Sequence, residues 1–134
     1  MKMANRTTVE KYLEGIKHEI SSEGGNTNYC FGAECRTGKS YSVRITITED
    51  DDCGVQCGFP LVEPQGAAVD EVLSHLNRRL HENRAGVTVF VEDGCAIAST
   101  GTSGECLDEQ LLSTKLTSVL ETASQLDTFL SGKR

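Results

Sequence analysis

The spacing of apolar residues predicts three amphipathic helices. The first is expected from Thr7 to Ser22, with Thr7 and Glu10 as a capping box and Gly24-Gly25 as the stop. Its apolar positions are Val9, Tyr12, Leu13, Ile16 and Ile20. The second is expected to end near Ala85-Gly86, with apolar positions at Val69, Val72, Leu73, Leu76 and Leu80. The third, about 20 to 24 residues long, has one apolar stripe: Leu112, Leu116, Val119, Leu120, Ala123, Leu126 and Leu130.

Alternating and turn-bounded segments predict five strands. Tyr41 to Thr48 alternates apolar and polar side chains, which is typical of a strand buried on one face. Thr27 to Cys35 and Cys53 to Val62 flank it across the turn-like segments RTGK and EDDD. Val87 to Thr100 reads as a hairpin around Asp93-Gly94. The predicted fold is a two-layer α+β domain in the order α-β-β-β-α-β-β-α, with the helices on one face of an antiparallel sheet.

Length and composition set limits on the class of protein. The 134 residues are the length of one domain, so we expect a single domain over 1–134, with 1–6 and 131–134 frayed. A net charge of −7 disfavours nucleic acid and anionic membrane as partners, because both attract basic proteins. No apolar run is long enough to span a bilayer, and the N-terminus lacks the apolar stretch of a secretory signal. We therefore expect a cytoplasmic protein.

Six cysteines raise the question of a metal or redox site, most clearly in DDCGVQCGFP, Asp51 to Pro60. In a regular strand, Cys53 and Cys57 would share a face but lie about 13 Å apart, too far for a common zinc ion or a disulfide. Their spacing also differs from the usual C-x2-C ligand pair. The interpretation is buried sheet cysteines with no metal and no cofactor, although a cross-strand site with Cys30 or Cys35 stays open.

Other candidate motifs favour structural interpretations. TGKS, Thr37 to Ser40, leads into a strand rather than a helix, so it indicates a hairpin turn and not a phosphate loop. EDDD, Glu49 to Asp52, lacks the spacing of a calcium loop and reads as a solvated turn. NRRLHENR, Asn77 to Arg84, reads as a solvated helix end rather than an anion site. His18 and His75 are expected on polar helix faces with no nucleophile nearby, so no catalytic residues are predicted.

Two segments resemble the second half of the YbjN family of sensory transduction regulators. They are LNRRLHENRAGVTVFVEDG and LDEQLLSTKLTSVLETASQLDTFL, in which a helix with a Leu-Asn step leads to an Asp-Gly hairpin and a long final helix. The predicted order of elements is also that of type III secretion chaperones of the Tir chaperone class, to which the YbjN family is similar in fold. The resemblance implies a non-catalytic module, usually a homodimer, that holds an extended segment of another protein.

The apolar character of both strand faces in Val87 to Val91 and Ala96 to Ala98 independently favours a protein partner. The expected partner or dimer contacts are on the second helix and the strand that follows it: Val72, Leu76, Leu80, Val87, Val89 and Val91. The leading hypothesis is a chaperone-like or regulatory protein-binding domain. The alternatives are an acidic inhibitor that mimics nucleic acid, and a thiol or zinc module. A monomer that buries all of this surface internally also stays open.

Overall fold

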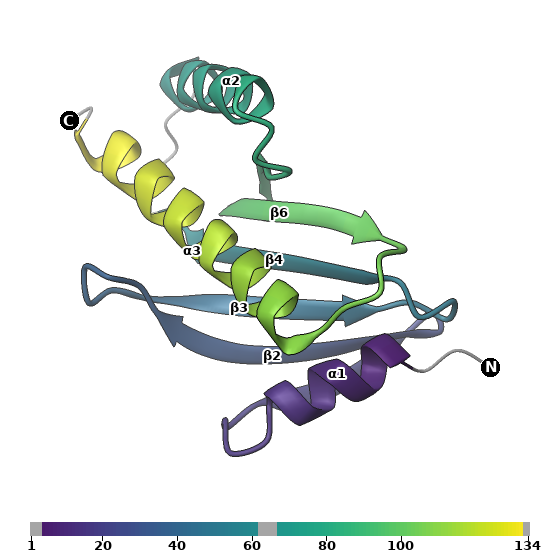
Figure 1. Ribbon diagram of the computed structural model, residues 1–134. Helices are drawn as coiled ribbons and strands as arrows, with labels where there is room; N and C mark the ends of the chain where they lie inside the picture. Colours follow the sequence, from purple (N-terminus) through teal and green to yellow (C-terminus); the bar gives the residue numbers. More distant parts are fainter. Residues whose placement is uncertain (1–3, 62–66, 133–134) are drawn as a thin grey trace.

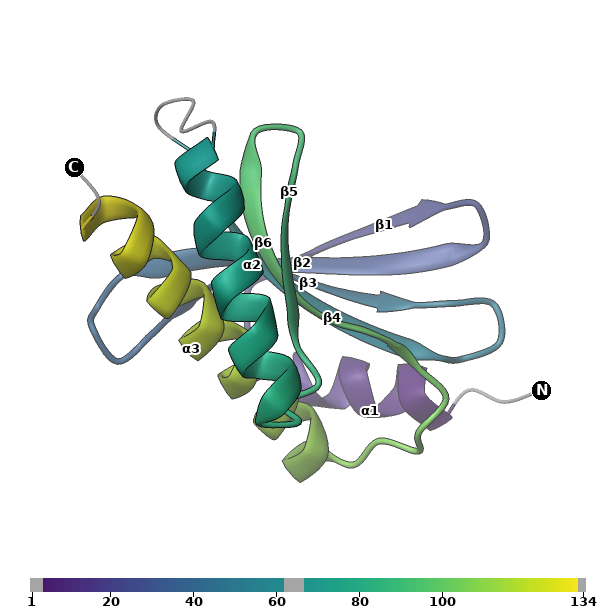
Figure 2. The same cartoon turned by 90° about the horizontal axis from the view of Figure 1, so that it is seen from above.

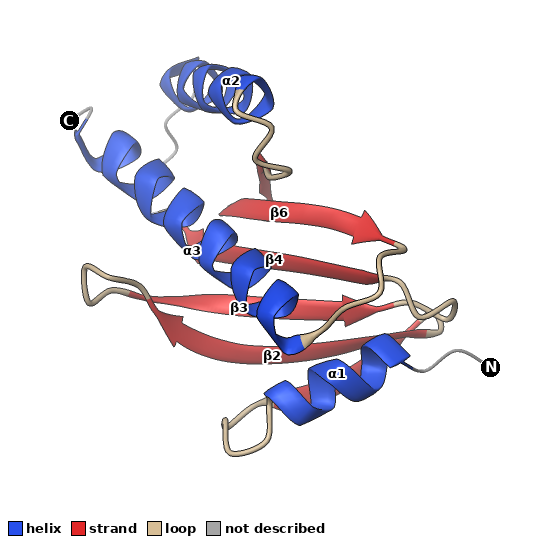
Figure 3. Ribbon diagram, in the orientation of Figure 1, coloured by secondary structure: helices blue, strands red, loops and turns tan. Residues whose placement is uncertain are grey.

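The computed structural model describes residues 4–61 and 67–132, which form one antiparallel sheet and three helices (Figures 1 and 3). The elements in chain order are α1 (Ala4–Tyr12), β1 (Glu19–Glu23), β2 (Asn26–Glu34), β3 (Ser40–Ile47), β4 (Cys53–Pro60), α2 (Ala67–Glu82), β5 (Thr88–Glu92), β6 (Cys95–Ser103) and α3 (Glu109–Gly132). The predicted α+β class and the order of the predicted elements are confirmed, and β1 is an additional strand.

The sheet has the strand order β1-β2-β3-β4-β6-β5, so β1 and β5 are its two edges. The predicted hairpin at TGKS is confirmed, because Cys35 N donates to Lys39 O at 2.9 Å and Gly38 N donates to Cys35 O at 3.0 Å. The hairpin at Asp93-Gly94 is also confirmed, and both residues have the positive φ that a type I′ turn requires. After α2 the chain returns as β5 at the edge, and β6 then lies between β4 and β5.

The helices cover one face of the sheet and one of its edges. In Figure 1 α3 crosses diagonally in front of the sheet and α1 lies below it, whereas Figure 2 shows α2 alongside β5. The predicted alternation of β3 is confirmed: Tyr41, Val43, Ile45 and Ile47 are buried on the helix side. The apolar stripe of α3 packs over them, with Leu112, Val119 and Leu126 fully buried. Apolar burial between these two layers is the main stabilising contribution.

The prediction of one helix from Thr7 to Ser22 was wrong in its second half. α1 ends at Tyr12, Gly15 has a left-handed φ of 81°, and Glu19–Glu23 forms β1. Gly24-Gly25 is therefore a hairpin turn, with φ values of 58° and 86°, rather than a helix stop. Ile16 and Ile20 fit the helical period by sequence, yet they are 38% and 59% exposed. His18 lies in the loop before β1 and not on a helix.

The N-terminus of α1 is capped from the turn between β3 and β4. Thr7 lies inside the helix, so the predicted capping box does not form. Instead, the carboxylate of Asp51 accepts hydrogen bonds from Asn5 N at 2.8 Å and Arg6 N at 3.0 Å. Helix N-terminal amides lack partners within the helix, so a buried carboxylate there satisfies them. Asp51 is 6% exposed, which corrects the prediction that the whole EDDD run is solvated.

Several predicted boundaries shift. Residues 4–6, expected to be frayed, belong to α1, and Asn5 is buried. At the other end α3 continues to Gly132. β4 ends at Pro60; Val62, Pro64 and Gly66, which were predicted to end the strand and break the chain, lie outside the described residues.

Candidate partner-binding edge and sheet face

The sheet face opposite α1 and α3 carries mainly small and polar side chains. On β3 this uncovered face holds Ser42, Arg44 and Thr46, which alternate with the buried residues of the core. Arg44 is in register with Cys30 of β2 and Gln56 of β4, so these three side chains share the face. At its far side the face becomes apolar, where Ile97 of β6 is in register with Phe90 of β5.

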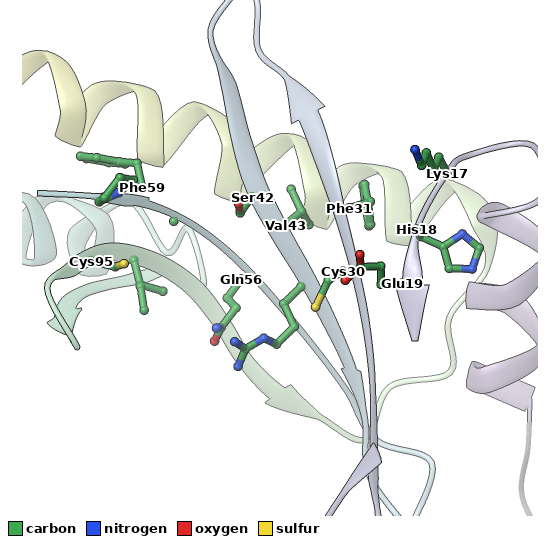
Figure 4. Close-up of a pocket in the computed structure, with 14 residues that line it drawn as sticks. Lys17, His18, Glu19, Cys30, Phe31, Ser42, Val43, Gln56, Phe59 and Cys95 are labelled. Carbon is green, nitrogen blue, oxygen red and sulfur yellow. The ribbon is translucent and has the colours of Figure 1, made fainter. Parts of the chain in front are cut away.

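A cavity of about 570 Å³ lies on this uncovered face, and we call it the hollow. It extends from Lys17 and Glu19, at the start of β1, to Cys95 and Ile97 on β6. In Figure 4 Cys30 and Gln56 point away from the side of the sheet toward which Val43 and Phe31 point. Val43 belongs to the core, so the strand alternation places its main chain rather than its side chain at the hollow.

The centre of the hollow contains small residues beside one basic residue. Ser42 is in register with Gly32 on one side and Gly58 on the other. A Cβ atom at Gly32 would meet nothing within 4 Å, so the surface above it is open. Arg44, two residues from Ser42, is exposed. The ion pairs of the described residues are Arg36–Glu121, Lys39–Asp127 and Lys115–Glu105, and none of them involves Arg44.

The β5 edge of the sheet is closed by a side chain of α2. Asn77 Nδ2 donates to Val89 O at 2.9 Å, and Val89 N donates to Asn77 Oδ1 at 2.8 Å. Both main-chain groups of Val89 therefore face away from β6 and toward α2. A strand that added to this edge would need these same two groups, so Asn77 occupies the pairing position.

The β1 edge carries no comparable cover. All five residues of Glu19–Glu23 are exposed. In a hairpin with a two-residue turn, the pair that flanks the turn exchanges hydrogen bonds, and the following pairs alternate. Glu23, Ser21 and Glu19 then bond to β2, while the N–H and C=O groups of Ile20 and Ser22 point outward. No described residue forms a hydrogen bond with these outward groups.

The residues predicted as partner or dimer contacts lie mostly inside the chain's own core. Val72, Leu76, Leu80, Val87 and Val89 are each buried, with at most 9% of the residue exposed. Only Val91, at 41%, is accessible. These five side chains pack between α2, α3 and the sheet, so in this structure they present no surface to a partner. The regular spacing of apolar residues by which they were identified reflects their burial in the core.

The cysteines are distributed over the core and the surface. All six are free, and among residues 4–61 and 67–132 no three His, Cys, Asp or Glu side chains cluster as metal ligands would. Cys53 and Cys57 lie on β4 and are buried, which confirms the interpretation of DDCGVQCGFP as sheet. Burial raises the pKa of Cys53 to about 11 and that of Cys57 to about 12. The Thr37 hydroxyl, 2.9 Å from Cys35 Sγ, lowers the pKa of Cys35.

The basic segment NRRLHENR has two roles in the structure. Arg78, Arg79 and His81 are exposed at the end of α2, as predicted for a solvated helix end. Asn77, the first residue of the segment, instead closes the β5 edge. Nothing in the sequence pattern distinguishes this asparagine from a surface residue.

Two features of the site were missed from the sequence. The β1 edge was assigned to a helix, although Gly24-Gly25 is also a recognised turn sequence for a hairpin. Arg44 was identified only as an outward residue of its strand, because its position between Cys30 and Gln56 depends on which strands lie beside it. Among the described helices, none is both long enough and apolar enough to cross a membrane.

Comparisons with known proteins identify the fold. No family model matches the chain, and no curated protein matches it in sequence, so the resemblance to the YbjN family stays a prediction. The chain is similar to a chain in the crystal structure of the ExsC–ExsE complex. The TM-score is 0.62 at 14% sequence identity, and the alignment covers 92% of each chain. The predicted type III secretion chaperone-like fold is thereby confirmed.

Proposed function

We propose that this chain is a non-catalytic, chaperone-like module that holds an extended segment of a partner protein by strand addition to β1. The exposed β1 edge carries the proposal, because the outward main-chain groups of Ile20 and Ser22 are available to a further strand. Ile20, 59% exposed, offers that strand an apolar side chain to pack against.

The contrast with β5 supports this choice of edge. Asn77 satisfies the corresponding groups of Val89, so an added strand at β5 would have to displace a formed pair of hydrogen bonds. The fold shared with a chain of the ExsC–ExsE complex, in which two proteins are associated, is consistent with a protein partner. The free thiols are consistent with a reducing compartment, so a cytoplasmic location is part of the proposal.

We further propose a homodimer that uses the outer surface of α2 and the end of β5. Because the other predicted contacts are buried, Val91 is the apolar side chain available there. The rest of that surface is polar, including Glu71, His75 and Arg78. Light scattering of wild type and Val91→Lys tests this part. A dimer that the substitution converts to monomer supports it, and a wild-type monomer contradicts it.

Strand addition is tested by quantitative capture of proteins from an extract of the source cells on immobilised wild type, Ser22→Pro and Ser22→Ala. Proline removes the outward N–H at position 22 without removing a bond to β2, and it is tolerated on edge strands. We expect Ser22→Pro to lose the captured partner by about 10-fold or more, and Ser22→Ala to retain it.

The location of the bound segment is then read from amide hydrogen exchange. A partner paired with β1 should slow exchange at Ile20 and Ser22 and leave Val89, already bonded to Asn77, unchanged. Capture that is equal for all three variants contradicts strand addition. If the captured protein is basic, and if its capture weakens with salt but is unchanged by Ser22→Pro, the result would support the acidic inhibitor instead.

A further inference from the structure

The hollow begins where the proposed partner strand would lie. Lys17, two residues before β1, and Glu19, its first residue, line one end of the hollow, and Cys95 and Ile97 line the other. A polypeptide that leaves the β1 edge toward the uncovered face therefore enters the hollow directly. Its path crosses β2, β3 and β4 at the level of Ser42 and Arg44.

The charge on this face is arranged around Arg44. By register, the acidic side chains on the uncovered side of the strands are Glu19 and Glu23 of β1, Glu34 of β2 and Glu92 of β5. Arg44 is the basic residue among these strand positions. Glu19 stands in the same row as Arg44 with Cys30 between them, and no ion pair joins the two among the described residues. An exposed guanidinium beside the Gln56 amide is a complement for a carboxylate.

The shape of the hollow suits a polypeptide main chain. Ser42 and Gly58 line the hollow, and Gly32 lies beside Ser42, so small residues leave a low floor on which a chain can approach the sheet closely. Ile97 bounds this floor: a Cβ at Gly58 would lie 3.3 Å from Ile97 Cγ1, which shows how closely that side chain lies against the glycine. An apolar side chain of the ligand would find its contact there.

We propose that the hollow binds a carboxylate-bearing stretch of the same extended partner segment that pairs with β1. The carboxylate of an aspartate or glutamate in the segment contacts Arg44 and Gln56, and an apolar side chain nearby packs against Ile97. This inference rests on the proposed function, because it takes the partner to be a polypeptide that reaches the hollow from β1.

The test uses a displayed library of random linear peptides, selected separately on wild type and on Arg44→Glu. Wild type should enrich peptides with Asp or Glu at one fixed position, and Arg44→Glu should enrich Lys or Arg at that position. An acidic peptide selected on wild type should bind Arg44→Gln about 10- to 100-fold more weakly. Circular dichroism checks that each variant is folded, which is expected because Arg44 is exposed.

Thiol footprinting locates the bound peptide. Cys30 and Cys95 line the hollow, whereas Cys106 is exposed outside it. The acidic peptide should slow alkylation of Cys30 and Cys95 and leave Cys106 unchanged. Ser42→Phe, which fills the floor of the hollow from an exposed position, should weaken binding of the peptide. Thr88→Phe, also exposed on the uncovered face but outside the hollow, is the matched control.

The outcomes separate this inference from the proposed function. Suppose that the selected peptides require the Ser22 amide. If they show no preference for acidic residues, or if they leave Cys30 and Cys95 unprotected, the inference is overturned and the proposed function is not. A failure to select any peptide that is sensitive to Ser22→Pro overturns the proposed function and the inference with it. Protection of Cys30 and Cys95 by dodecanoate, with no peptide bound, would assign the hollow to a small apolar anion and also overturn the inference.

Discussion

The two edges of this sheet are treated in opposite ways. At β5, a helix lies alongside the strand and one asparagine side chain bonds to both main-chain groups of Val89 (Figure 2). At β1, all five residues are exposed and the outward groups of Ile20 and Ser22 form no hydrogen bond with a described residue. The same contrast holds for the two faces, because α1 and α3 cover one and leave the hollow on the other.

This difference separates an edge that is closed by the protein's own contacts from an edge that is available to a partner. A free edge strand is a liability in solution, and short length and charged side chains are common protections. β1 has both, with five residues and glutamates at its two ends. Those features oppose self-association, yet they leave the outward N–H and C=O groups of β1 accessible to a specific partner. The following experiments test whether the covered and uncovered regions differ as the structure indicates.

The largest expected difference is in thiol reactivity. Burial raises the pKa of Cys57 to about 12 against an ordinary value of 9.0, so its thiolate fraction near neutral pH falls about 1000-fold. Cys57 in the covered face should therefore be alkylated at least about 1000-fold more slowly than in the unfolded chain. Cys35, whose pKa is lowered, should react fastest. Mass spectrometry of time-resolved alkylation measures both. Similar rates for Cys35 and Cys57 would contradict the assigned burial.

The two faces should differ next in their contribution to stability. Ile45 is fully buried on the covered face, and Ile45→Ala should lower the free energy of unfolding by about 2 to 5 kcal/mol. Ser42 is exposed on the other face of the same strand, so Ser42→Ala should change it by less than about 0.5 kcal/mol. Urea denaturation measures both. Equal losses would mean that the uncovered face is packed after all.

The covered edge can be opened by removing Asn77. Asn77→Ala leaves the N–H and C=O of Val89 without their partners and should cost about 1 to 3 kcal/mol. It should also allow β5 to pair with other chains, so self-association at high concentration is expected. Asn83→Ala, the same substitution at an exposed position just after α2, is the control. If Asn77→Ala keeps the oligomeric state of wild type at every concentration tested, α2 itself is sufficient to block the edge.

A smaller effect is expected from alkaline pH. Tyr29 and Tyr41 have pKa values raised to about 12, chiefly by burial and then by hydrogen bonds to Glu10 and Asp127. The folded state then holds these protons more tightly than the unfolded state, so their stabilisation is complete below about pH 9 to 10. It is lost as pH rises toward about 12. Unfolding midpoints should fall over this range, and Tyr29→Phe should reduce the slope.

Local patterns were sufficient for most elements. The alternation of Tyr41 to Thr48, the Asp93-Gly94 turn and the stripe of α3 each predicted the correct structure. Each of these patterns reflects the local geometry of a single element, so it can be recognised in a short stretch of sequence. The same reasoning failed at Ile16 and Ile20, where helical spacing is present but the side chains stay exposed.

The site depended on contacts between distant segments. Pairing with β2 made Glu19–Glu23 a strand, and the insertion of β6 between β4 and β5 determined which strand became the second edge. Asn77 and Asp51 acquired their roles from main-chain groups elsewhere in the chain, at Val89 and at Asn5 and Arg6. Arg44 lies between Cys30 and Gln56 because of its strand neighbours.

The sequence by itself determined the fold class, the core-facing residues of the long elements and the expectation that the Cys53–Pro60 segment is sheet. Only the tertiary structure decided which edge is closed, where the hollow lies and that the predicted contact residues are core. The reason is physical: a side chain's period along the chain reports that it is buried, but not what buries it. Register and strand order are set by pairing between segments far apart in sequence, and these pairings leave little trace in local spacing.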